Sequence, residues 1–277
     1  MTEETCFRAG ALVLLVVIVS TVYLQPALAQ ATPADLAGLS PYWEPVVSRW
    51  EHIIVWYADR RHLDPDFVAS VIWKESRGIS TVQGPTGAVG LMCVKPFPWR
   101  PSAEELENPW TNVAAGTRTL AHVIRDGNGD AFYALAAYNG GWDQIHLRVT
   151  RNYATDVLQH YVRAVAAEHG LPHDGDWVAV LSVEGLPDQN TVTVLGPQRP
   201  VSRYTDRPLS RVDFPSVPEG YSPHATLMAF EDDQGRQVRA NLWLLDGNPP
   251  FPLVRELMAS PLSSGEVPGQ VLGRLPD

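Results

Sequence analysis

Glu75 is the residue of this 277-residue chain whose type and position best fit acid chemistry. Asp64 and Pro65 have the types of an N-cap and a first helical residue, so the sequence predicts a helix that starts there and stops near Gly78. Glu75 follows Val71 by four residues, which places its carboxyl on the apolar, core-facing stripe of that helix. Burial and the C-terminal end of the helix dipole both favour the protonated carboxyl. Glu75 is therefore predicted to be a general acid that keeps its proton near neutral pH.

A run of small and apolar residues follows the acid at residues 87–92, with the sequence Gly-Ala-Val-Gly-Leu-Met. Glycines used in this way let the backbone approach another surface, and they often line a cleft. Glu75-Ser76, followed at this spacing by that run, resembles the soluble lytic transglycosylase family, relatives of goose-type lysozyme. The alternative is a core helix whose glutamate caps a neighbouring backbone.

Three further motifs carry the same resemblance over residues 40–170: Asn108-Pro109 with Asn112, Gly116 and Leu120; Ala137-Tyr138-Asn139; and Arg151-Asn152-Tyr153. The resemblance implies that Tyr138 and Asn139 border the sugar next to the acid, although Tyr138 as a core residue and Asn139 as a helix cap are the alternatives. It implies that Tyr153 reaches back towards Glu75.

The resemblance also implies the reaction and the site. Glu75 would protonate the glycosidic oxygen of the β-1,4 bond between N-acetylmuramoyl and N-acetylglucosamine units of peptidoglycan. It would then take the proton of the C6 hydroxyl as a 1,6-anhydro ring closes, with no metal and no cofactor. The residues implied to bind the substrate are Ser76, Gly90, Leu91, Met92, Cys93, Tyr138, Asn139 and Tyr153.

The sequence departs from the family pattern on the sugar-facing wall. Cys93 stands where the family usually has Gln, and Gly84 where it usually has Ser; Gly140 replaces the usual Ala after Tyr-Asn. These changes affect substrate contacts more than they affect the acid. A thiol lining a groove is reactive if exposed, and a small buried apolar residue is the other interpretation of Cys93.

Two other functions stay open at this point. A true hydrolase of the lysozyme or chitinase kind needs a second carboxylate, for which Asp143 or Asp130 would have to approach the cleft. The second open function is that of a non-catalytic cell-wall-binding protein that kept the fold. His169 and His173 cannot share a helix face because Gly170 and Pro172 lie between them, so no metal site is predicted.

Composition and the N-terminus indicate where the chain works. The formal charge of −10 argues against a nucleic-acid partner, because phosphate binding needs basic surface. An apolar run at residues 9–24 ends at Ala27-Leu28-Ala29, so residues 1–29 are predicted to be a signal peptide, with an uncleaved membrane anchor as the alternative. Either predicts an extracytoplasmic protein that is secreted, periplasmic or associated with the cell wall. Cys6 precedes that run, so no disulfide with Cys93 is expected.

The fold class predicted is α+β, with a mainly α-helical lysozyme-like domain at residues 40–172 and a small β-rich module of unknown family at 175–277. The expected helices start near Ser40 or Glu44 and at Asp64, Pro109, Ala131 and about Asn152, the last two ending near Tyr138 and His169. Gly116 within the Pro109 helix predicts close approach of another backbone. The many Gly and Pro residues at 79–100 predict a loop-rich wall.

The β-rich module is predicted from Val- and Thr-rich segments at 177–183 and 190–195 and from a hairpin, 225–231 and 236–245, around Asp232-Asp233-Gln234-Gly235. Residues 197–223 are predicted to be an irregular loop or interdomain strap. In the last strand Val238, Ala240, Leu242 and Leu244 alternate with Arg239, Asn241 and Trp243, which predicts one packed and one wet face. Trp177, Tyr204, Tyr221 and Trp243 are either core residues or sugar-stacking aromatics.

Overall fold

The computed structural model describes residues 38–174, 179–186, 192–195, 211–214 and 221–245. The helices are α1 (Pro45–Ser48), α2 (Glu51–Asp59), α3 (Pro65–Ser76), α4 (Ala103–Leu106), α5 (Pro109–Asp126), α6 (Ala131–Gly140) and α7 (Arg148–Glu168), with a 3₁₀ turn, η1 (Trp142–Gln144). The strands are β1 (Ala179–Glu184), β2 (Val192–Leu195), β3 (Arg211–Phe214), β4 (Tyr221–Glu231) and β5 (Gln237–Leu245). This inventory confirms the α+β class. The predicted signal peptide lies outside the described residues.

Helix α3 confirms the sequence prediction. Asp64 is its N-cap, and the Asp64 side chain accepts hydrogen bonds from the backbone N–H groups of Asp66 and Phe67. Pro65 occupies the first turn, and Arg77 ends the helix in the left-handed conformation with φ of 53°. The helix runs between α2 and α7, and its apolar side chains belong to the main core.

The first predicted helix is instead two short helices. Arg49 and Trp50 separate α1 from α2, and the backbone departs from helical geometry at Trp50, with φ of −96° and ψ of 6°. Both side chains donate to the carbonyl oxygen of Gly78, from Arg49 Nη2 at 2.9 Å and from Trp50 Nε1 at 2.8 Å. Those bonds fix this break against the end of α3, which is a tertiary contact that periodicity does not report.

Helices α5, α6 and α7 lie close to their predicted ranges. The Asn108 cap of α5 and the Asp130 cap of α6 are confirmed. Gly116 is tightly packed as predicted, but against a side chain and not a backbone: a Cβ there would lie 2.4 Å from Met92 Sδ. Helix α7 begins four residues before the predicted Asn152, because Thr150 Oγ1 lies 2.7 Å and 2.8 Å from the carbonyl oxygens of Gln144 and Leu147 and stabilises an extra first turn.

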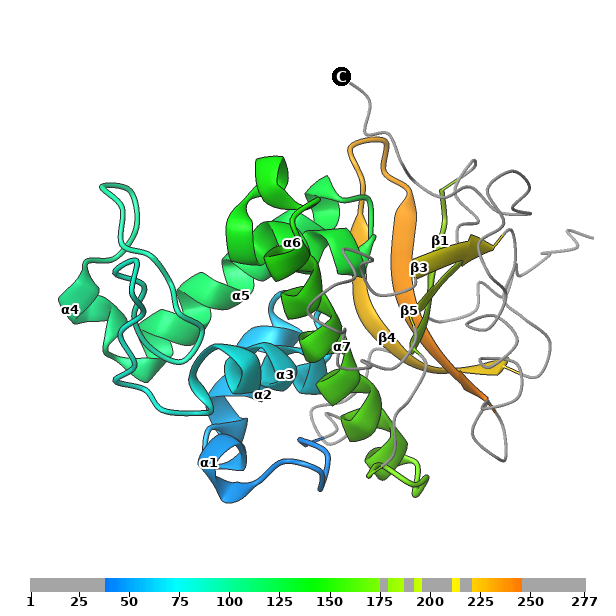
Figure 1. Cartoon of the computed structure of the whole chain (residues 1–277), viewed down its shortest axis with the longest axis horizontal. Coiled ribbons are helices and arrows are strands. Elements are labelled where there is room, and N and C mark those ends of the chain that lie inside the picture. The colour runs from blue at the N-terminus through cyan, green and yellow to red at the C-terminus, as the bar shows by residue number, and fades with distance from the viewer. Residues whose placement is uncertain (1–37, 175–178, 187–191, 196–210, 215–220, 246–277) are drawn as a thin grey trace, which may run out of the picture. The chain divides into compact units, whose positions relative to one another are not determined.

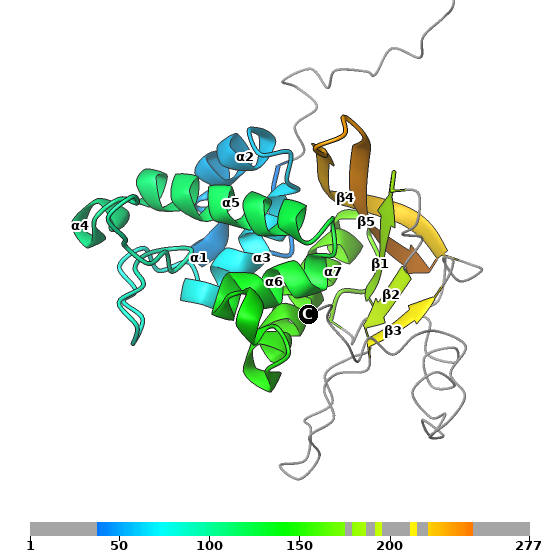
Figure 2. The same ribbon diagram turned by 90° about the horizontal axis from the view of Figure 1, so that it is seen from above.

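The five strands form one antiparallel sheet in the order β3-β2-β1-β5-β4, which can be followed in Figure 2. The predicted hairpin is β4–β5, and its turn is held by Asp232 Oδ1, which accepts from the N–H groups of Gln234 and Arg236. The four apolar residues of β5 that were predicted to pack are buried. Asn241 was predicted to be wet and is buried, because its Oδ1 accepts from Thr226 Oγ1 on β4 at 2.9 Å.

Strand β4 meets the helical part at the loop between α2 and α3. The backbone N–H of Asp64 donates to the carbonyl of Leu227 at 2.9 Å, and the N–H of Ala229 donates to that of His62 at 3.2 Å. Leu227 and Met228 belong to the same core cluster as the side chains of α3. Helix α7 lies against α3 and α6 on one side and against β1 on the other (Figure 1). The division into two domains near residue 175 stays a prediction.

The described helices include none that is both long and apolar enough to cross a membrane. Of the four aromatic residues proposed for core or sugar stacking, Trp243 is the one whose side chain is described. It is partly buried, and its Nε1 donates to Ser182 Oγ at 2.6 Å.

Candidate active site

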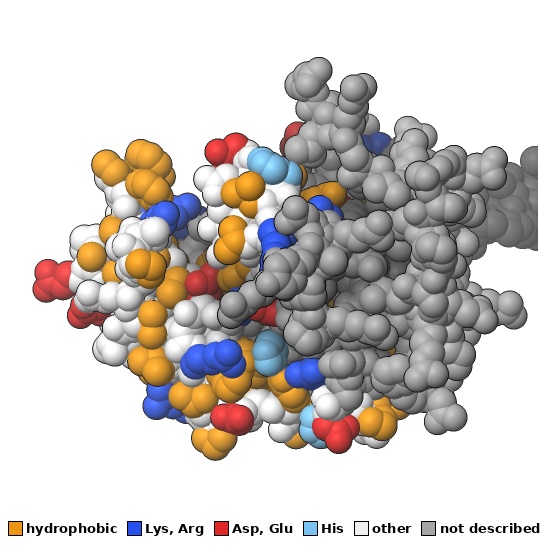
Figure 3. Space-filling view, in the orientation of Figure 1, with side chains coloured by type: hydrophobic (Ala, Val, Ile, Leu, Met, Phe, Trp, Pro, Cys, Tyr) orange, Lys and Arg blue, Asp and Glu red, His pale blue; other side chains and the backbone are white. Residues whose placement is uncertain are grey.

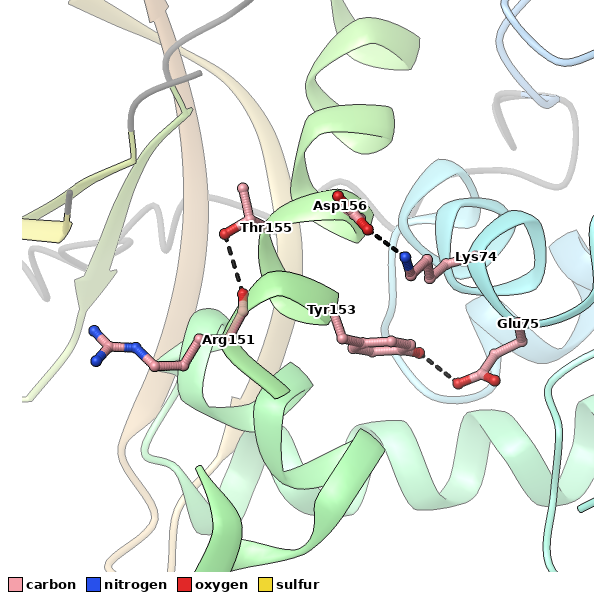
Figure 4. A network of polar contacts seen from close by, with 6 residues as sticks. All are labelled: Lys74, Glu75, Arg151, Tyr153, Thr155 and Asp156. Atoms are coloured by element: carbon pink, nitrogen blue, oxygen red, sulfur yellow. Dashed lines mark hydrogen bonds and ion pairs between the residues drawn. The ribbon is translucent and has the colours of Figure 1, made fainter. Parts of the chain in front are cut away.

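Glu75 lies in the last turn of α3 and faces the first half of α7. The phenolic hydroxyl of Tyr153 donates to Glu75 Oε1 at 2.7 Å, a contact drawn in Figure 4. Tyr153 is only 5% exposed, so its ring closes one side of the carboxyl. The position that the sequence predicted for the acid, on the core-facing stripe of its helix, is confirmed.

The surroundings of Glu75 favour its protonated form. Burial raises the pKa of the Glu75 carboxyl above its ordinary value. The bond from Tyr153, the neighbouring Cys93 thiol and the charge of Lys74 each lower that pKa in part. Because burial is the largest of these effects, the carboxyl holds its proton to a higher pH than an exposed glutamate does.

The glycine-rich wall beside the acid is organised by one buried amide, that of Asn112 on α5. Its Oδ1 accepts from the N–H of Met92 at 2.8 Å, and its Nδ2 donates to the carbonyls of Val89 at 2.7 Å and Leu106 at 2.9 Å. Gly90 has φ of 82°, and a Cβ there would lie 2.2 Å from Asn112 Nδ2. Glycine is therefore required at position 90 so that the wall can close on this amide.

Tyr138 links α6 to that wall. Its hydroxyl donates to the carbonyl oxygen of Met92 at 2.9 Å. Burial and the nearby Glu75 raise the pKa of Tyr138 well above its usual value, so its hydroxyl stays protonated. Tyr138 and Tyr153 thus both lie near the acid, from α6 and α7 respectively.

Three of the predicted substrate-binding residues, Ser76, Leu91 and Met92, have buried side chains. Ser76 Oγ lies 2.8 Å from the carbonyl of Leu91 and accepts from the N–H of Gly78, so it joins the end of α3 to the wall. These side chains support the wall from behind. Direct contact between them and a substrate stays a prediction.

Cys93 occupies the wall position closest to the acid. It has a positive φ of 45°, and its Sγ donates to the backbone carbonyl of Glu75 at 3.4 Å. Burial and the adjacent Glu75 raise the pKa of the thiol to about 12. A thiol that stays protonated is a poor nucleophile, so the structure favours a packing role for Cys93 over a reactive one.

Gly84, the other departure on the wall, leaves space for a larger residue. A Cβ there would have ordinary van der Waals contact with Ala88, 3.6 Å away. The loss of the usual serine therefore removes a hydroxyl without being imposed by crowding.

Asn139 is exposed at the end of α6 and lines a cavity of about 490 Å³. The residues around this cavity are Lys74, Asn139, Arg148, Val149, Asn152, Tyr153 and Asp156. Tyr153 lines this cavity and also binds Glu75, so the cavity lies next to the residue that holds the acid. Figure 3 shows this face of the molecule hollowed between the loop-rich wall and helices α6 and α7, with acidic side chains at the bottom.

The ion pair between Lys74 and Asp156 beside the acid was not anticipated from the sequence. Lys74 precedes Glu75 on α3, and Asp156 follows Tyr153 by three residues on α7. The spacing of Tyr153 and Asp156 places them on one face of α7, which is a signal available in the sequence. Their partners on α3 are about eighty residues away, so no local pattern pairs them.

No cluster of three or more His, Cys, Asp or Glu side chains that could hold a metal ion occurs within the described part of the chain. His169 ends α7, and His173 lies in the segment after it, where its ring contacts that of Tyr42.

Comparison with known proteins assigns the helical part of the chain. Residues 53–160 match the family model described as the transglycosylase SLT domain, which is the domain of the family that the sequence motifs resemble. The matched segment contains α3, the wall, α5, α6 and most of α7, which are the elements that surround Glu75.

A curated relative is the membrane-bound lytic murein transglycosylase E of Buchnera aphidicola, 30% identical over 89 residues, or 28% of this chain and 40% of the relative. Among solved structures, an inactive mutant of the lytic transglycosylase Slt of Pseudomonas aeruginosa is 23% identical over 48% of this chain and 26% of its own, with a TM-score of 0.41. The 70 kDa soluble lytic transglycosylase of Escherichia coli is 21% identical over 47% of this chain and 27% of its own, with a TM-score of 0.40. The chain thus spans two fifths of the curated relative it matches.

Proposed function

We propose that this protein is a peptidoglycan lytic transglycosylase in which Glu75 is the single acid and base. The observation that carries the proposal is the Glu75–Tyr153 pair: a partly buried carboxyl with a raised pKa, held by a tyrosine, inside the matched SLT domain. A carboxyl whose pKa is raised by burial is better suited than an exposed glutamate to protonate a leaving glycosidic oxygen.

The reaction would proceed in two proton transfers through the same carboxyl. Glu75 gives its proton to the oxygen of the β-1,4 bond between N-acetylmuramoyl and N-acetylglucosamine units, and that bond breaks through an oxocarbenium-like state. The C6 hydroxyl oxygen of the muramoyl unit then bonds to C1, and its proton passes to the Glu75 carboxylate. The products are a 1,6-anhydro-N-acetylmuramoyl end and an N-acetylglucosamine unit whose 4-hydroxyl carries the transferred proton, and no water is consumed.

The roles of the surrounding groups follow from their geometry. The Tyr153 hydroxyl holds Oε1 in place and so orients the carboxyl that would exchange a proton with substrate. The bond from Tyr153 also stabilises the carboxylate that exists between the two transfers. Asn139, with Tyr153, lines the adjacent cavity and would contact the sugar there.

The hydrolase alternative is less well supported because both predicted second carboxylates are placed unfavourably. Asp130 is the N-cap of α6, and its Oδ1 accepts from the N–H of Tyr133 at 3.1 Å. Asp143 is exposed in η1. Asp156 lines the cavity beside Tyr153, but its charge is paired with Lys74.

The partners and location proposed are those of this substrate: peptidoglycan glycan strands, in an extracytoplasmic compartment. Nucleic acid is not expected, given the formal charge of −10. Membrane contact is expected only if the N-terminal segment stays uncleaved.

Digestion of purified sacculi by the full chain, with mass spectrometry of the released muropeptides, tests the proposal. Wild type is expected to release products with 1,6-anhydro ends, and Glu75→Gln to release none while still binding sacculi. Reducing ends would indicate a hydrolase. Wild-type protein that binds without releasing products would indicate a non-catalytic wall-binding protein, and cleavage by Glu75→Gln would remove Glu75 from the mechanism.

A further inference from the structure

Helices α3 and α7 are joined at neighbouring positions by two polar contacts of different kinds. Glu75 accepts a hydrogen bond from Tyr153, and Lys74 forms an ion pair with Asp156 (Figure 4). Lys74 and Glu75 are consecutive on α3, and Tyr153 and Asp156 share one face of α7. The ion pair is therefore the closest cross-link to the contact that orients the acid.

The ion pair between Lys74 and Asp156 is partly shielded from solvent. The side chains of Lys74 and Asp156 are 30% and 28% exposed. Charges in such a position act through a lower effective dielectric than water, so they influence a neighbouring carboxyl over several ångströms. Both also line the cavity that Tyr153 shares with the acid.

We propose that Lys74 and Asp156 are positioning residues for Glu75: the pair holds the end of α3 against α7 and keeps the charge beside the acid close to zero. The inference rests on the proposed function only in treating Glu75 as the reacting acid. Neither residue is a catalytic residue, since both act through Glu75.

The groups around Glu75 leave Lys74 as the charged neighbour that acts on it. Burial raises the pKa of Tyr153 and Tyr138 well above their usual range, and that of Cys93 to about 12, so all three are neutral at working pH. Lys74, in contrast, lowers the pKa of Glu75 through its positive charge.

The groups around the ion pair lead to the same conclusion. Burial first, and then the charges of Arg163, Arg77 and Lys74 in that order, lower the pKa of His160, one turn after Asp156 on α7, to about 4, so the imidazole is neutral at working pH. Arg148 lines the far side of the cavity and is exposed to solvent, which screens its charge. Asp156 is therefore the residue that balances Lys74.

This arrangement predicts opposite effects from the two halves of one ion pair. Lys74→Met removes the cation that favours the Glu75 carboxylate, so the pKa of Glu75 should rise. Asp156→Asn keeps the shape of the side chain but leaves Lys74 unbalanced, so the pKa of Glu75 should fall. The double variant Lys74→Met/Asp156→Asn restores neutrality and should return the value towards wild type.

The experiment is a ¹³C NMR titration of the Glu75 carboxyl in the full chain, assigned by comparison with Glu75→Gln. We expect shifts of about half a pH unit or more, upward for Lys74→Met and downward for Asp156→Asn. Lys74→Arg, which keeps the charge, and Lys95→Met, which removes the charge of an exposed lysine on the wall, should leave the value within about 0.2 units of wild type. Thermal melts of each variant check that it is folded.

Equal-sign shifts from the two single variants, or shifts no larger than that of Lys95→Met, would overturn the proposal. If one single variant fails to fold, the other compared with Lys74→Arg still decides the sign. The titration needs no catalysis, so it stays valid if the proposed function fails. If Glu75 is also the reacting acid, the alkaline limb of the pH–rate profile moves with the NMR value in each variant.

Discussion

The two ends of helix α3 each carry a carboxyl that accepts a hydrogen bond from a tyrosine of α7. The two carboxyls differ in the other hydrogen bonds that they accept. At the N-terminal end, Asp64 accepts hydrogen bonds from two backbone N–H groups and, through Oδ2, from the Tyr161 hydroxyl at 2.9 Å. At the C-terminal end, Glu75 accepts on Oε1 from the Tyr153 hydroxyl. Burial raises the pKa of both, that of Asp64 to about 6.

The comparison teaches that burial and a tyrosine partner do not by themselves define a catalytic acid. Asp64 has both, but its oxygens are occupied by the cap and by Tyr161, and it sits at the helix end whose dipole stabilises an anion. Glu75 sits at the opposite end, where the dipole disfavours an anion, and its tyrosine partner lines a cavity. The acid proposed to react is therefore the one at the helix end that favours the protonated carboxyl.

The largest expected effect separates the two acids by activity. Glu75→Gln should lower the rate of glycan cleavage by about 10²–10⁴-fold, the usual contribution of a general acid and base. Its free energy of unfolding should not fall, because a neutral amide replaces a carboxyl that burial already disfavours as an anion. Turnover on sacculi and a urea unfolding curve measure both. A loss of stability that accounts for the lost turnover would make Glu75 a second structural acid.

At the N-terminal end of α3 we expect the opposite result: a substitution that lowers stability and leaves activity nearly unchanged. Asp64→Ala removes the cap and leaves Tyr161 without its partner, so the free energy of unfolding should fall by about 2–4 kcal/mol. The rate per folded molecule should change less than threefold. Unfolding curves and active-site-normalised rates test this, and a rate loss as large as that of Glu75→Gln would contradict the division of roles.

The two tyrosines provide a matched pair of hydroxyl deletions. Tyr153→Phe removes a donor that lowers the pKa of Glu75, so that pKa should rise and the alkaline limb of the pH–rate profile should move upward. The rate at the optimum should fall about tenfold as the carboxyl loses its orientation. Tyr161→Phe should leave the profile in place and cost about 1–2 kcal/mol of stability. If Tyr161→Phe moved the limb equally, the shift would be a general effect of loosening α7.

A further prediction concerns Asp66, which is 3% exposed and whose pKa burial and Asp64 raise to about 7. This pKa lies above the unfolded value of 3.8. The protonated Asp66 carboxyl therefore makes its full contribution to the free energy of unfolding below about pH 3.8, and that contribution is lost as the pH rises to about 7. Asp66→Asn should therefore raise the free energy of unfolding at pH 8 by on the order of 1–3 kcal/mol and change it little at pH 4. Melts at the two pH values measure it; equal changes at both would refute the burial of a charge here.

Much of this site could be predicted from local sequence because its positions follow helical periodicity and capping rules. The Asp64 cap and the helical stripe through Val71 that carries Glu75 required no knowledge of the rest of the fold. The Tyr153 contact came from family resemblance alone, since no physical rule links residues 78 positions apart. Gly90 could be recognised as a close approach, but the Asn112 amide that requires it could not.

Strand β3 lies within residues 197–223, which were predicted to be irregular, so that prediction is wrong for residues 211–214. The other features that the sequence did not predict are tertiary. The break between α1 and α2 depends on bonds to Gly78, and the burial of Asn241 depends on Thr226 across the sheet. The early start of α7, at Arg148, depends on the hydrogen bonds of the Thr150 hydroxyl. A threonine inside the first turn does not mark the first residue of a helix in the way that an N-cap does. Each depends on which residues meet across elements, and propensity and periodicity carry no information about that.

Digestion of sacculi in ¹⁸O-labelled water is the measurement that tests the central claim most directly. If Glu75 cleaves the bond by internal attack of the C6 hydroxyl, the new muramoyl ends form without solvent oxygen, so wild type should yield anhydro ends with no label and Glu75→Gln should yield no new ends. One ¹⁸O atom in each new end would show that water is the nucleophile and would contradict the account.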